Sequence, residues 1–122
     1  MKITKIFFHL INFIFLIFYL YPGSILGFLL YGNLSKQPQI TPDFYFSSNH
    51  VYVFIVLTLF GLISHINKKN IIIYFLFISI FLELTHLVIP NRSFQFGDLF
   101  GNITGVLISV LILKTYNYLE KK

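Results

Sequence analysis

The sequence predicts an all-α integral membrane protein, a bundle of four transmembrane helices with both termini in the cytoplasm. The chain has 122 residues, of which 57% are hydrophobic and 11% are charged, and its mean hydropathy is +0.81. A soluble domain of this length needs a far more polar surface. Four apolar runs approach the length of about 20 residues that crosses a hydrocarbon core. The basic residues lie at the ends of these runs and not along a stripe, so no nucleic-acid partner is expected.

The four predicted spans cover residues of about 6–30, 50–66, 71–89 and 99–116, and they form a single domain over residues 1–122. In the first span, Pro22 is expected to kink or end the helix, so that the segment after it lies along the outer membrane interface. Lys2 and Lys5 before an apolar run would also fit a signal peptide, but the small residues of a cleavage site are missing, and we expect a retained helix. His9 and His65 lie near span ends and receive no role.

The distribution of positive charge sets the predicted orientation. Lys36 and Arg92 are the basic residues on one side of the predicted membrane. The other side holds seven lysines: Lys2, Lys5, Lys68, Lys69, Lys114, Lys121 and Lys122. Because short cytoplasmic loops carry the excess of basic residues, both termini and the hairpin around residue 68 are predicted to be cytoplasmic.

One stretch, "ELTHLVIPNRSFQFGDLFGN" from Glu83 to Asn102, is unusually polar for so apolar a chain. Pro90 is expected to end the third helix, which places Glu83 roughly 10 Å inside the bilayer. The outer ends of the second, third and fourth helices thus bring polar groups to one level. The predicted site consists of Asn49, His50, Glu83, His86, Arg92, Asp98 and Asn102.

Two interpretations of this polar group remain open. Burying an ionisable side chain in a span costs about 2.5–3.5 kcal/mol, so Glu83 is expected either to pair with Arg92 or His86 or to line a wet cavity. The group is then a ligand site, or it is a hydrogen-bonded clamp that fixes three helices in register. Along the fourth helix, Gly105 and Ser109 extend the same face and are expected to let another helix approach closely.

Chemical alternatives are only weakly specified. Glu83-x-x-His86 has the spacing of four-helix di-iron ligands, but a second copy is missing. A zinc ion held by His50, Glu83 and His86 is conceivable but nothing specifies it, and we predict no metal and no cofactor. Glu83, His86 and Asp98 could supply general acid–base catalysis, although no nucleophile or phosphate-loop motif accompanies them. A proton conduit is disfavoured because no polar series continues along the third helix.

The segment "ELTHLVIPNRSFQFGDLFGNITG" resembles the signature of the VanZ-like family of small multi-spanning bacterial membrane proteins. That signature runs E-x-x-Q, a few apolar residues, P-x-R-x and then D-x-x-x-N-x-x-G. The matching positions are Glu83, Pro90, Arg92, Asp98, Asn102 and Gly105. The resemblance departs from the family at His86, where Gln is usual, and at Asn49, His50 and Val53, where D-K-x-x-H is usual.

The resemblance implies a multi-pass protein of the bacterial cytoplasmic membrane, of the kind linked to teicoplanin resistance. It implies an accessory of cell-envelope or exopolysaccharide processes more than an enzyme. We expect an outward-facing pocket in which the Arg92 guanidinium contacts an anionic head group, because its planar fork suits phosphate. The expected partners are membrane lipids, a lipid-linked glycan precursor or envelope-biosynthesis proteins. An enzyme acting on lipid-linked or glycan substrates is the alternative.

Overall fold

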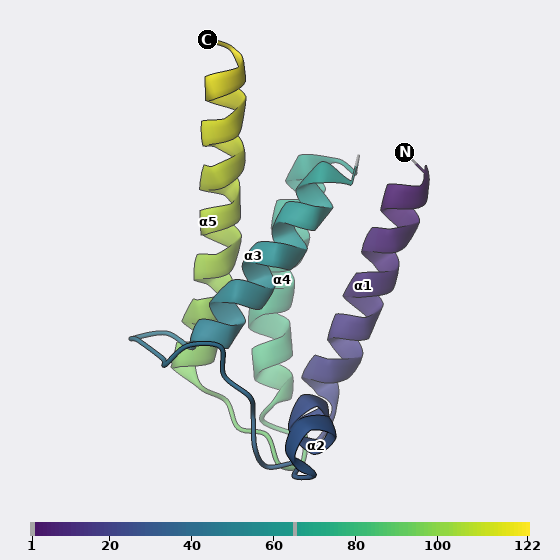
Figure 1. The fold of residues 1–122 in the computed structure, drawn as a ribbon, viewed down its shortest axis with the longest axis vertical. Helices are drawn as coiled ribbons and strands as arrows, with labels where there is room; N and C mark the ends of the chain where they lie inside the picture. The colour runs from purple at the N-terminus through teal and green to yellow at the C-terminus, as the bar shows by residue number, and fades with distance from the viewer. Residues whose placement is uncertain (1, 65) are drawn as a thin grey trace.

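The computed structural model describes residues 2–64 and 66–122, so His65 lies outside the described residues. Within these ranges the chain is all-α, with five helices and no strand. The helices are α1 (Lys2–Leu20), α2 (Ile25–Tyr31), α3 (Ser48–Ile63), α4 (Lys68–Thr85) and α5 (Phe96–Glu120). Both termini and the α3–α4 turn lie at one end of the bundle, whereas α2 and the two long loops lie at the other (Figure 1).

The run expected as one span over residues 6–30 is divided into two helices. Pro22 ends α1 because it disfavours helical backbone at the residue before it, and Gly23 then takes a φ of 126°, which reverses the chain. Ser24 starts α2 as its N-cap by accepting a hydrogen bond of 2.9 Å from the Gly27 amide. Gly32 ends α2 in the left-handed conformation, at a φ of 65°. The bundle therefore has a short fifth helix of seven residues at the end where the predicted site lies.

The helix in the region of the third predicted span, residues 71–89, ends earlier at its C-terminus than expected. Helix α4 ends at Thr85, and the amides of His86, Leu87 and Val88 bond to carbonyls three residues earlier, which tightens the last turn. Pro90 therefore does not mark the helix end. Glu83 lies two residues from the end of α4 and not a full two turns inside it.

Helices α3 and α5 form the closest-packed pair. A Cβ at Gly105 would lie 2.7 Å from the Phe54 Cβ and 2.7 Å from the Val51 carbonyl oxygen. One turn further on, the Ser109 hydroxyl donates to the Ile55 carbonyl at 3.1 Å. The expectation that Gly105 and Ser109 allow a close helix approach is confirmed, and the contact joins the first half of α3 to the middle of α5.

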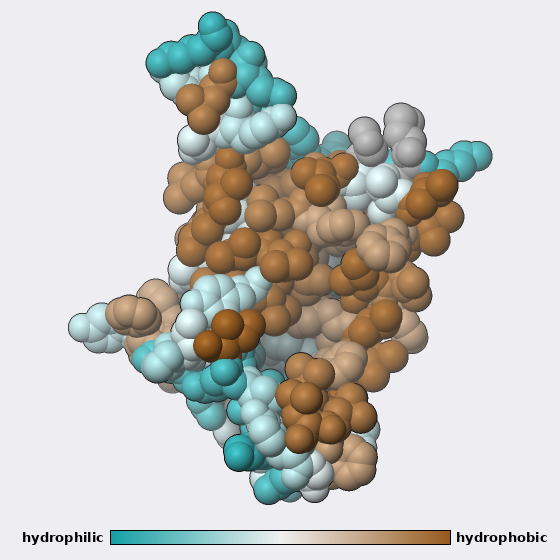
Figure 2. Space-filling model, viewed as in Figure 1, coloured by the Kyte–Doolittle hydropathy of each residue, from teal (hydrophilic) through white to brown (hydrophobic). Residues whose placement is uncertain are grey.

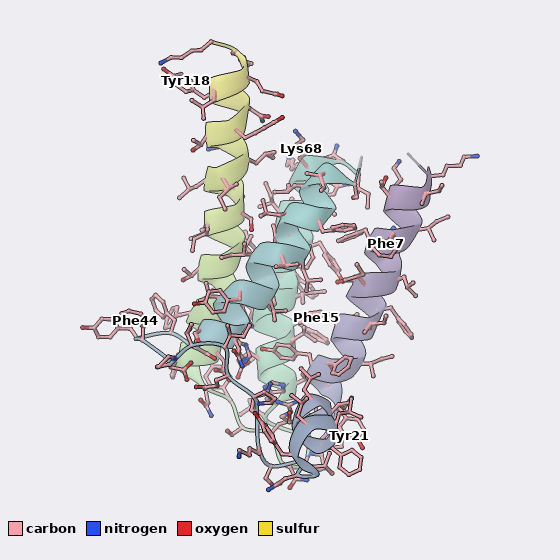
Figure 3. All side chains as sticks on the ribbon, viewed as in Figure 1. Phe7, Phe15, Tyr21, Phe44, Lys68 and Tyr118 are labelled. Atoms are coloured by element: carbon pink, nitrogen blue, oxygen red, sulfur yellow. The ribbon has the colours of Figure 1, made fainter. Side chains whose placement is uncertain are left out.

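Aromatic rings fill the centre of the bundle. Phe54 and Phe75 are fully buried, with ring centroids 6.2 Å apart in an edge-on arrangement. Phe15 points from α1 into the bundle and meets Phe54 edge-on, whereas Phe44 points away at the tip of a loop (Figure 3). On the face drawn in Figure 2, apolar side chains cover the middle of the molecule and polar side chains lie at its two ends.

Two helices, α1 and α5, are long and apolar enough to cross a membrane. Helix α3 is apolar but has 16 residues. Helix α4 has 18 residues and includes three charged side chains, Lys68, Lys69 and Glu83, of which the two lysines lie in its first turn.

Candidate functional site

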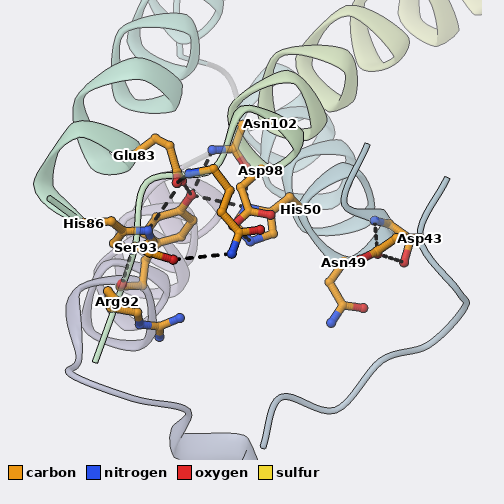
Figure 4. A network of polar contacts seen from close by, with 12 residues as sticks. Asp43, Asn49, His50, Glu83, His86, Arg92, Ser93, Asp98 and Asn102 are labelled. Carbon is orange, nitrogen blue, oxygen red and sulfur yellow. Dashed lines mark hydrogen bonds and ion pairs between the residues drawn. The ribbon is translucent and has the colours of Figure 1, made fainter. Parts of the chain in front are cut away.

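Polar side chains from four helices meet at the end of the bundle that also carries α2 (Figure 4). Tyr19 comes from the last turn of α1, and His50 from the first turn of α3. Glu83 comes from the last turn of α4, and Asp98 and Asn102 lie on one face of α5 because they are four residues apart. The helix ends thus deliver acidic, aromatic and amide groups to a single cluster.

Glu83 lies at the centre of this cluster and its side chain is 0% exposed. Its Oε2 accepts a hydrogen bond of 2.8 Å from the Tyr19 hydroxyl, and its Oε1 accepts one of 2.9 Å from the Gln95 backbone amide. The His86 Nδ1 lies 3.5 Å from Oε2. Of the two partners that the sequence left open for Glu83, Arg92 and His86, the structure places His86 beside it, and Tyr19 and Gln95 are further partners. Both carboxylate oxygens accept hydrogen bonds, which meets the main requirement for burying such a group.

A directional chain of hydrogen bonds leads from α3 to Glu83. The His50 Nδ1 lies 2.8 Å from the Asn102 Oδ1, which can only accept, so that nitrogen carries the proton. The Asn102 amide donates at 2.9 Å to the Tyr19 hydroxyl, and that hydroxyl donates in turn to Glu83. Tyr19 therefore joins α1 to α3, α4 and α5.

His86 caps α4 and packs against the same tyrosine. Its ring stacks on the Tyr19 ring, with centroids 4.8 Å apart and planes inclined by 14°. Its Nε2 lies 3.1 Å from the Tyr19 carbonyl oxygen, which accepts only, so the proton on Nε2 is donated there. His86 thus fixes the end of α1.

Arg92 also holds the end of α1. Its Nη2 donates to the carbonyls of Phe18 and Gly23 at 3.2 and 2.6 Å, and its Nε donates to the Tyr21 carbonyl at 3.1 Å. Phe18 lies in the last turn of α1 and the other two residues lie just after it, at the negative end of the helix dipole, so a guanidinium is favoured there. Burial lowers the pKa of Arg92, and the nearby carboxylates of Asp98 and Glu83 act against that shift. Of the three guanidinium nitrogens, Nε and Nη2 have these partners, and Nη1 has no hydrogen-bond partner among the described residues.

His50 and Asp98 form the accessible part of the cluster. The His50 Nε2 and the Asp98 Oδ2 are 3.6 Å apart, and the two side chains are 20% and 18% exposed. Among the described residues, donor atoms of His50, Glu83 and Asp98 lie within 4.8 Å of one another, a grouping that could hold a metal ion.

A cavity of about 580 Å³ opens onto His50 and Asp98. Its lining combines an apolar and a polar set of side chains, called below the apolar wall and the polar wall. The apolar wall comes from α1, α2 and α3, and consists of Phe15, Phe18, Ile25, Leu26, Val53 and Phe54. The polar wall includes Gln37, Gln39, Asp43, Asn49, His50, His86, Arg92, Gln95 and Asp98. Glu83 and Asn102 are fully buried behind this wall.

Asn49 reaches the cavity while holding the loop that leads from α2 to α3. Its amide donates at 2.6 Å to the Pro38 carbonyl, and its Oδ1 accepts from the Ile40 amide at 3.3 Å. Asp43 fixes the far end of this loop by accepting from the backbone amide of Ser48 at 2.9 Å. The loop therefore borders the cavity in a defined conformation.

Sequence reasoning missed Tyr19 and Gln95, the two direct partners of Glu83 that lie outside the predicted set. Tyr19 sits at the end of a run rich in aromatic residues, in which nothing distinguishes it from its neighbour Tyr21. Gln95 contributes a backbone amide, which any residue except proline supplies. The position of Tyr19 three residues before Pro22, and so in the last turn of a helix, was the available signal.

The arrangement can therefore bind a polar group at His50 and Asp98, exchange a proton between them, and hold an apolar group against α1 and α3. Each of these uses the cavity, because Glu83 is closed off behind Tyr19 and Gln95. The chain matches no protein-family model, no curated protein sequence and no solved structure.

Proposed function

We propose that the chain is a multi-pass protein of the bacterial cytoplasmic membrane, crossed by α1, α3, α4 and α5 with both termini inside. The candidate membrane-crossing helices α1 and α5 support this, as does the apolar helix α3. The lysines near the termini and the α3–α4 turn belong to the same end of the bundle, which is the arrangement that the positive-inside rule requires (Figure 1). The cavity and α2 then face outward.

Within this orientation, the function that the geometry supports best is that of a non-enzymatic accessory of cell-envelope processes. The accessory binds a membrane amphiphile, such as a lipid head group or a lipid-linked glycan precursor. The observation that carries the proposal is that one cavity is lined by both an apolar and a polar set of side chains. A pocket built in this way suits a ligand that is apolar at one end and hydrogen-bonding at the other.

The resemblance of residues 83–105 to the VanZ-like signature supports the same assignment, and with it a role in glycopeptide resistance or exopolysaccharide processes. The structure changes the expected contact at Arg92. Most of its guanidinium is engaged by α1, so a head group is bound mainly by His50, Asp98 and the amide side chains of the polar wall, with Nη1 of Arg92 as one further donor.

A matched pair of substitutions on α3 tests the proposal. Val53 lines the cavity, whereas Val56 is 63% exposed on the outside of the same helix. In lipid nanodiscs, Val53→Phe is expected to reduce binding of a polyprenyl-diphosphate-linked sugar at least tenfold, while Val56→Phe leaves it unchanged. Equal binding by both variants and the wild type would place the ligand elsewhere and refute the proposed pocket.

An enzyme acting on lipid-linked or glycan substrates is the second candidate. The observation in its favour is that His50 and Asp98 are both partly exposed to the cavity, so an acid–base pair can reach a bound substrate. Of the residues that the sequence suggested for acid–base catalysis, Asp98 can still reach a substrate in the cavity. Glu83 is fully buried and reaches no substrate in this arrangement. Conversion of an envelope lipid by the wild type that Asp98→Asn abolishes, with binding intact, would favour the enzyme over the accessory.

A further inference from the structure

His50, Glu83 and Asp98 come from three different helices and place one donor atom each within 4.8 Å of the other two. We propose that these residues form a binding site for one divalent transition-metal cation at the polar end of the cavity. The set differs from the zinc ligands considered from the sequence, because Asp98 takes the place of His86. The proposal goes beyond the proposed ligand of the cavity and does not depend on it.

The orientation of His50 is that of a metal ligand. Its Nδ1–H donates to the Asn102 Oδ1 at 2.8 Å, which leaves the lone pair of Nε2 directed toward Asp98. Ligating histidines in proteins characteristically donate their other ring N–H to a carbonyl or carboxylate in this way. Asn102 thus sets the tautomer that a cation requires.

The separation of His50 from Asp98 also leaves room for an ion between them. In a neutral imidazole with its proton on Nδ1, Nε2 is an acceptor that faces the Asp98 Oδ2, which in the carboxylate is a second acceptor. Their distance of 3.6 Å is too long for a hydrogen bond. Bond lengths of about 2.0–2.1 Å at tetrahedral zinc place two ligand atoms roughly 3.4 Å apart. A bound cation therefore fits this pair with little movement.

Glu83 supplies the third ligand from a fixed position. The Tyr19 hydroxyl and the Gln95 amide each donate to one of its oxygens, and every carboxylate oxygen retains a second lone pair. Hydrogen bonds of this kind orient ligating carboxylates in metal sites. The donor atom of Glu83 lies within 4.8 Å of those of His50 and Asp98, so a cation bound by all three residues draws them closer together than they stand in the structure.

Access and charge agree with a bound cation. His50 and Asp98 line the cavity, so an ion can enter and the remaining coordination positions face water. The two carboxylates together balance the charge of a divalent ion. The Arg92 guanidinium is engaged by three carbonyls at the end of α1, and His86, whose Nδ1 lies 3.5 Å from Glu83, donates from Nε2 to the Tyr19 carbonyl. One imidazole with two carboxylates suits Zn²⁺ better than Mg²⁺, which prefers oxygen ligands alone.

The experiment uses the full chain in detergent, stripped with a chelator and titrated with Zn²⁺, with Mg²⁺ as the comparison ion. The wild type is expected to bind one Zn²⁺ per chain, with much weaker binding of Mg²⁺. Asp98→Asn is expected to reduce the Zn²⁺ affinity at least tenfold, since even the loss of an outer partner typically costs that much. Glu120→Gln is the control, because it removes the same charge from an exposed side chain in the last turn of α5, at the other end of the bundle, and should leave the affinity unchanged.

Thermal unfolding provides the second measurement. Zn²⁺ should raise the Tm of the wild type and of Glu120→Gln but not that of Asp98→Asn, because a ligand stabilises only the folded state that binds it. If Asp98→Asn does not fold, His50→Gln replaces it in both measurements. A wild type that binds no stoichiometric Zn²⁺ would overturn the proposal and leave His50 and Asp98 as a protonated ion pair. Equal Zn²⁺ affinity of the wild type and the ligand variant would overturn it too, by placing the ion elsewhere.

Discussion

The Tyr19 hydroxyl donates a hydrogen bond of 2.8 Å to the buried Glu83 carboxylate, and so joins residues 64 positions apart in the chain. The same hydroxyl accepts from the Asn102 amide at 2.9 Å. One phenol oxygen therefore holds α1, α4 and α5 together at the end of the bundle where the cavity lies. Without it, α1 would be held there chiefly by backbone contacts to His86 and Arg92.

Tyr19→Phe is expected to lower the free energy of unfolding by about 1–3 kcal/mol, because it leaves the Glu83 Oε2 and the Asn102 amide in a buried site with fewer partners. Unfolding of the purified protein in detergent, followed by circular dichroism, measures the loss. Tyr21→Phe is the matched control. The Tyr21 ring is 40% exposed, and its removed hydroxyl should change stability by no more than about 0.5 kcal/mol. Equal effects of the two variants would show that the Tyr19 hydroxyl does not hold α1, α4 and α5 together.

Gly105→Ala is expected to destabilise the bundle by about 1–3 kcal/mol, because the new methyl group would lie 2.7 Å from Phe54 and Val51 and force α3 and α5 apart. Gly97→Ala on the same helix is the control, since its nearest atom, the Tyr45 carbonyl oxygen, would be 3.8 Å away. This control should be neutral or slightly stabilising. Denaturant titration of both variants checks the difference, and a neutral Gly105→Ala would mean that α3 and α5 can separate without cost.

The helical regions and the polar residues near their ends were predictable from the sequence because hydropathy and charge are local properties. The partners of these residues were not. Arg92 was expected to contact an anionic head group, and in the structure most of its guanidinium binds carbonyls at the end of α1. One of them, the Phe18 carbonyl, is left free because Pro22 has no N–H, and it meets Arg92 only when the chain folds back. Tyr19 was missed for the same reason. Its role depends on contacts with Glu83 of α4 and Asn102 of α5, and contacts between residues so far apart in the chain leave no pattern in the sequence around Tyr19.

Arg92→Lys is expected to loosen the end of α1, because one ammonium group cannot reproduce the fork that reaches the carbonyls of Phe18, Tyr21 and Gly23. Hydrogen exchange of the segment 16–24, followed by mass spectrometry, should become faster by about tenfold or more, as expected for the loss of one charged hydrogen bond worth about 1.5–3 kcal/mol. Lys36→Gln is the control. It removes the other basic side chain at this end, whose ammonium lies 4.3 Å from the Tyr31 ring centroid, and should leave exchange in this segment unchanged. Unchanged exchange in Arg92→Lys would show that the carbonyls are held without the fork.

The proposed orientation is testable directly, because the chain contains no cysteine and each introduced cysteine is therefore a unique label site. Phe44 is 88% exposed at the tip of the loop between α2 and α3, and Lys69 lies in the first turn of α4 at the opposite end. In intact cells, a membrane-impermeant maleimide should label Phe44→Cys, whereas Lys69→Cys should react only after lysis. The reason is that the lysine-rich end is retained in the cytoplasm by its positive charge. Labelling of Lys69→Cys but not Phe44→Cys in intact cells would show that the protein has the opposite orientation in the membrane. The cavity would then open to the cytoplasm, away from envelope glycans.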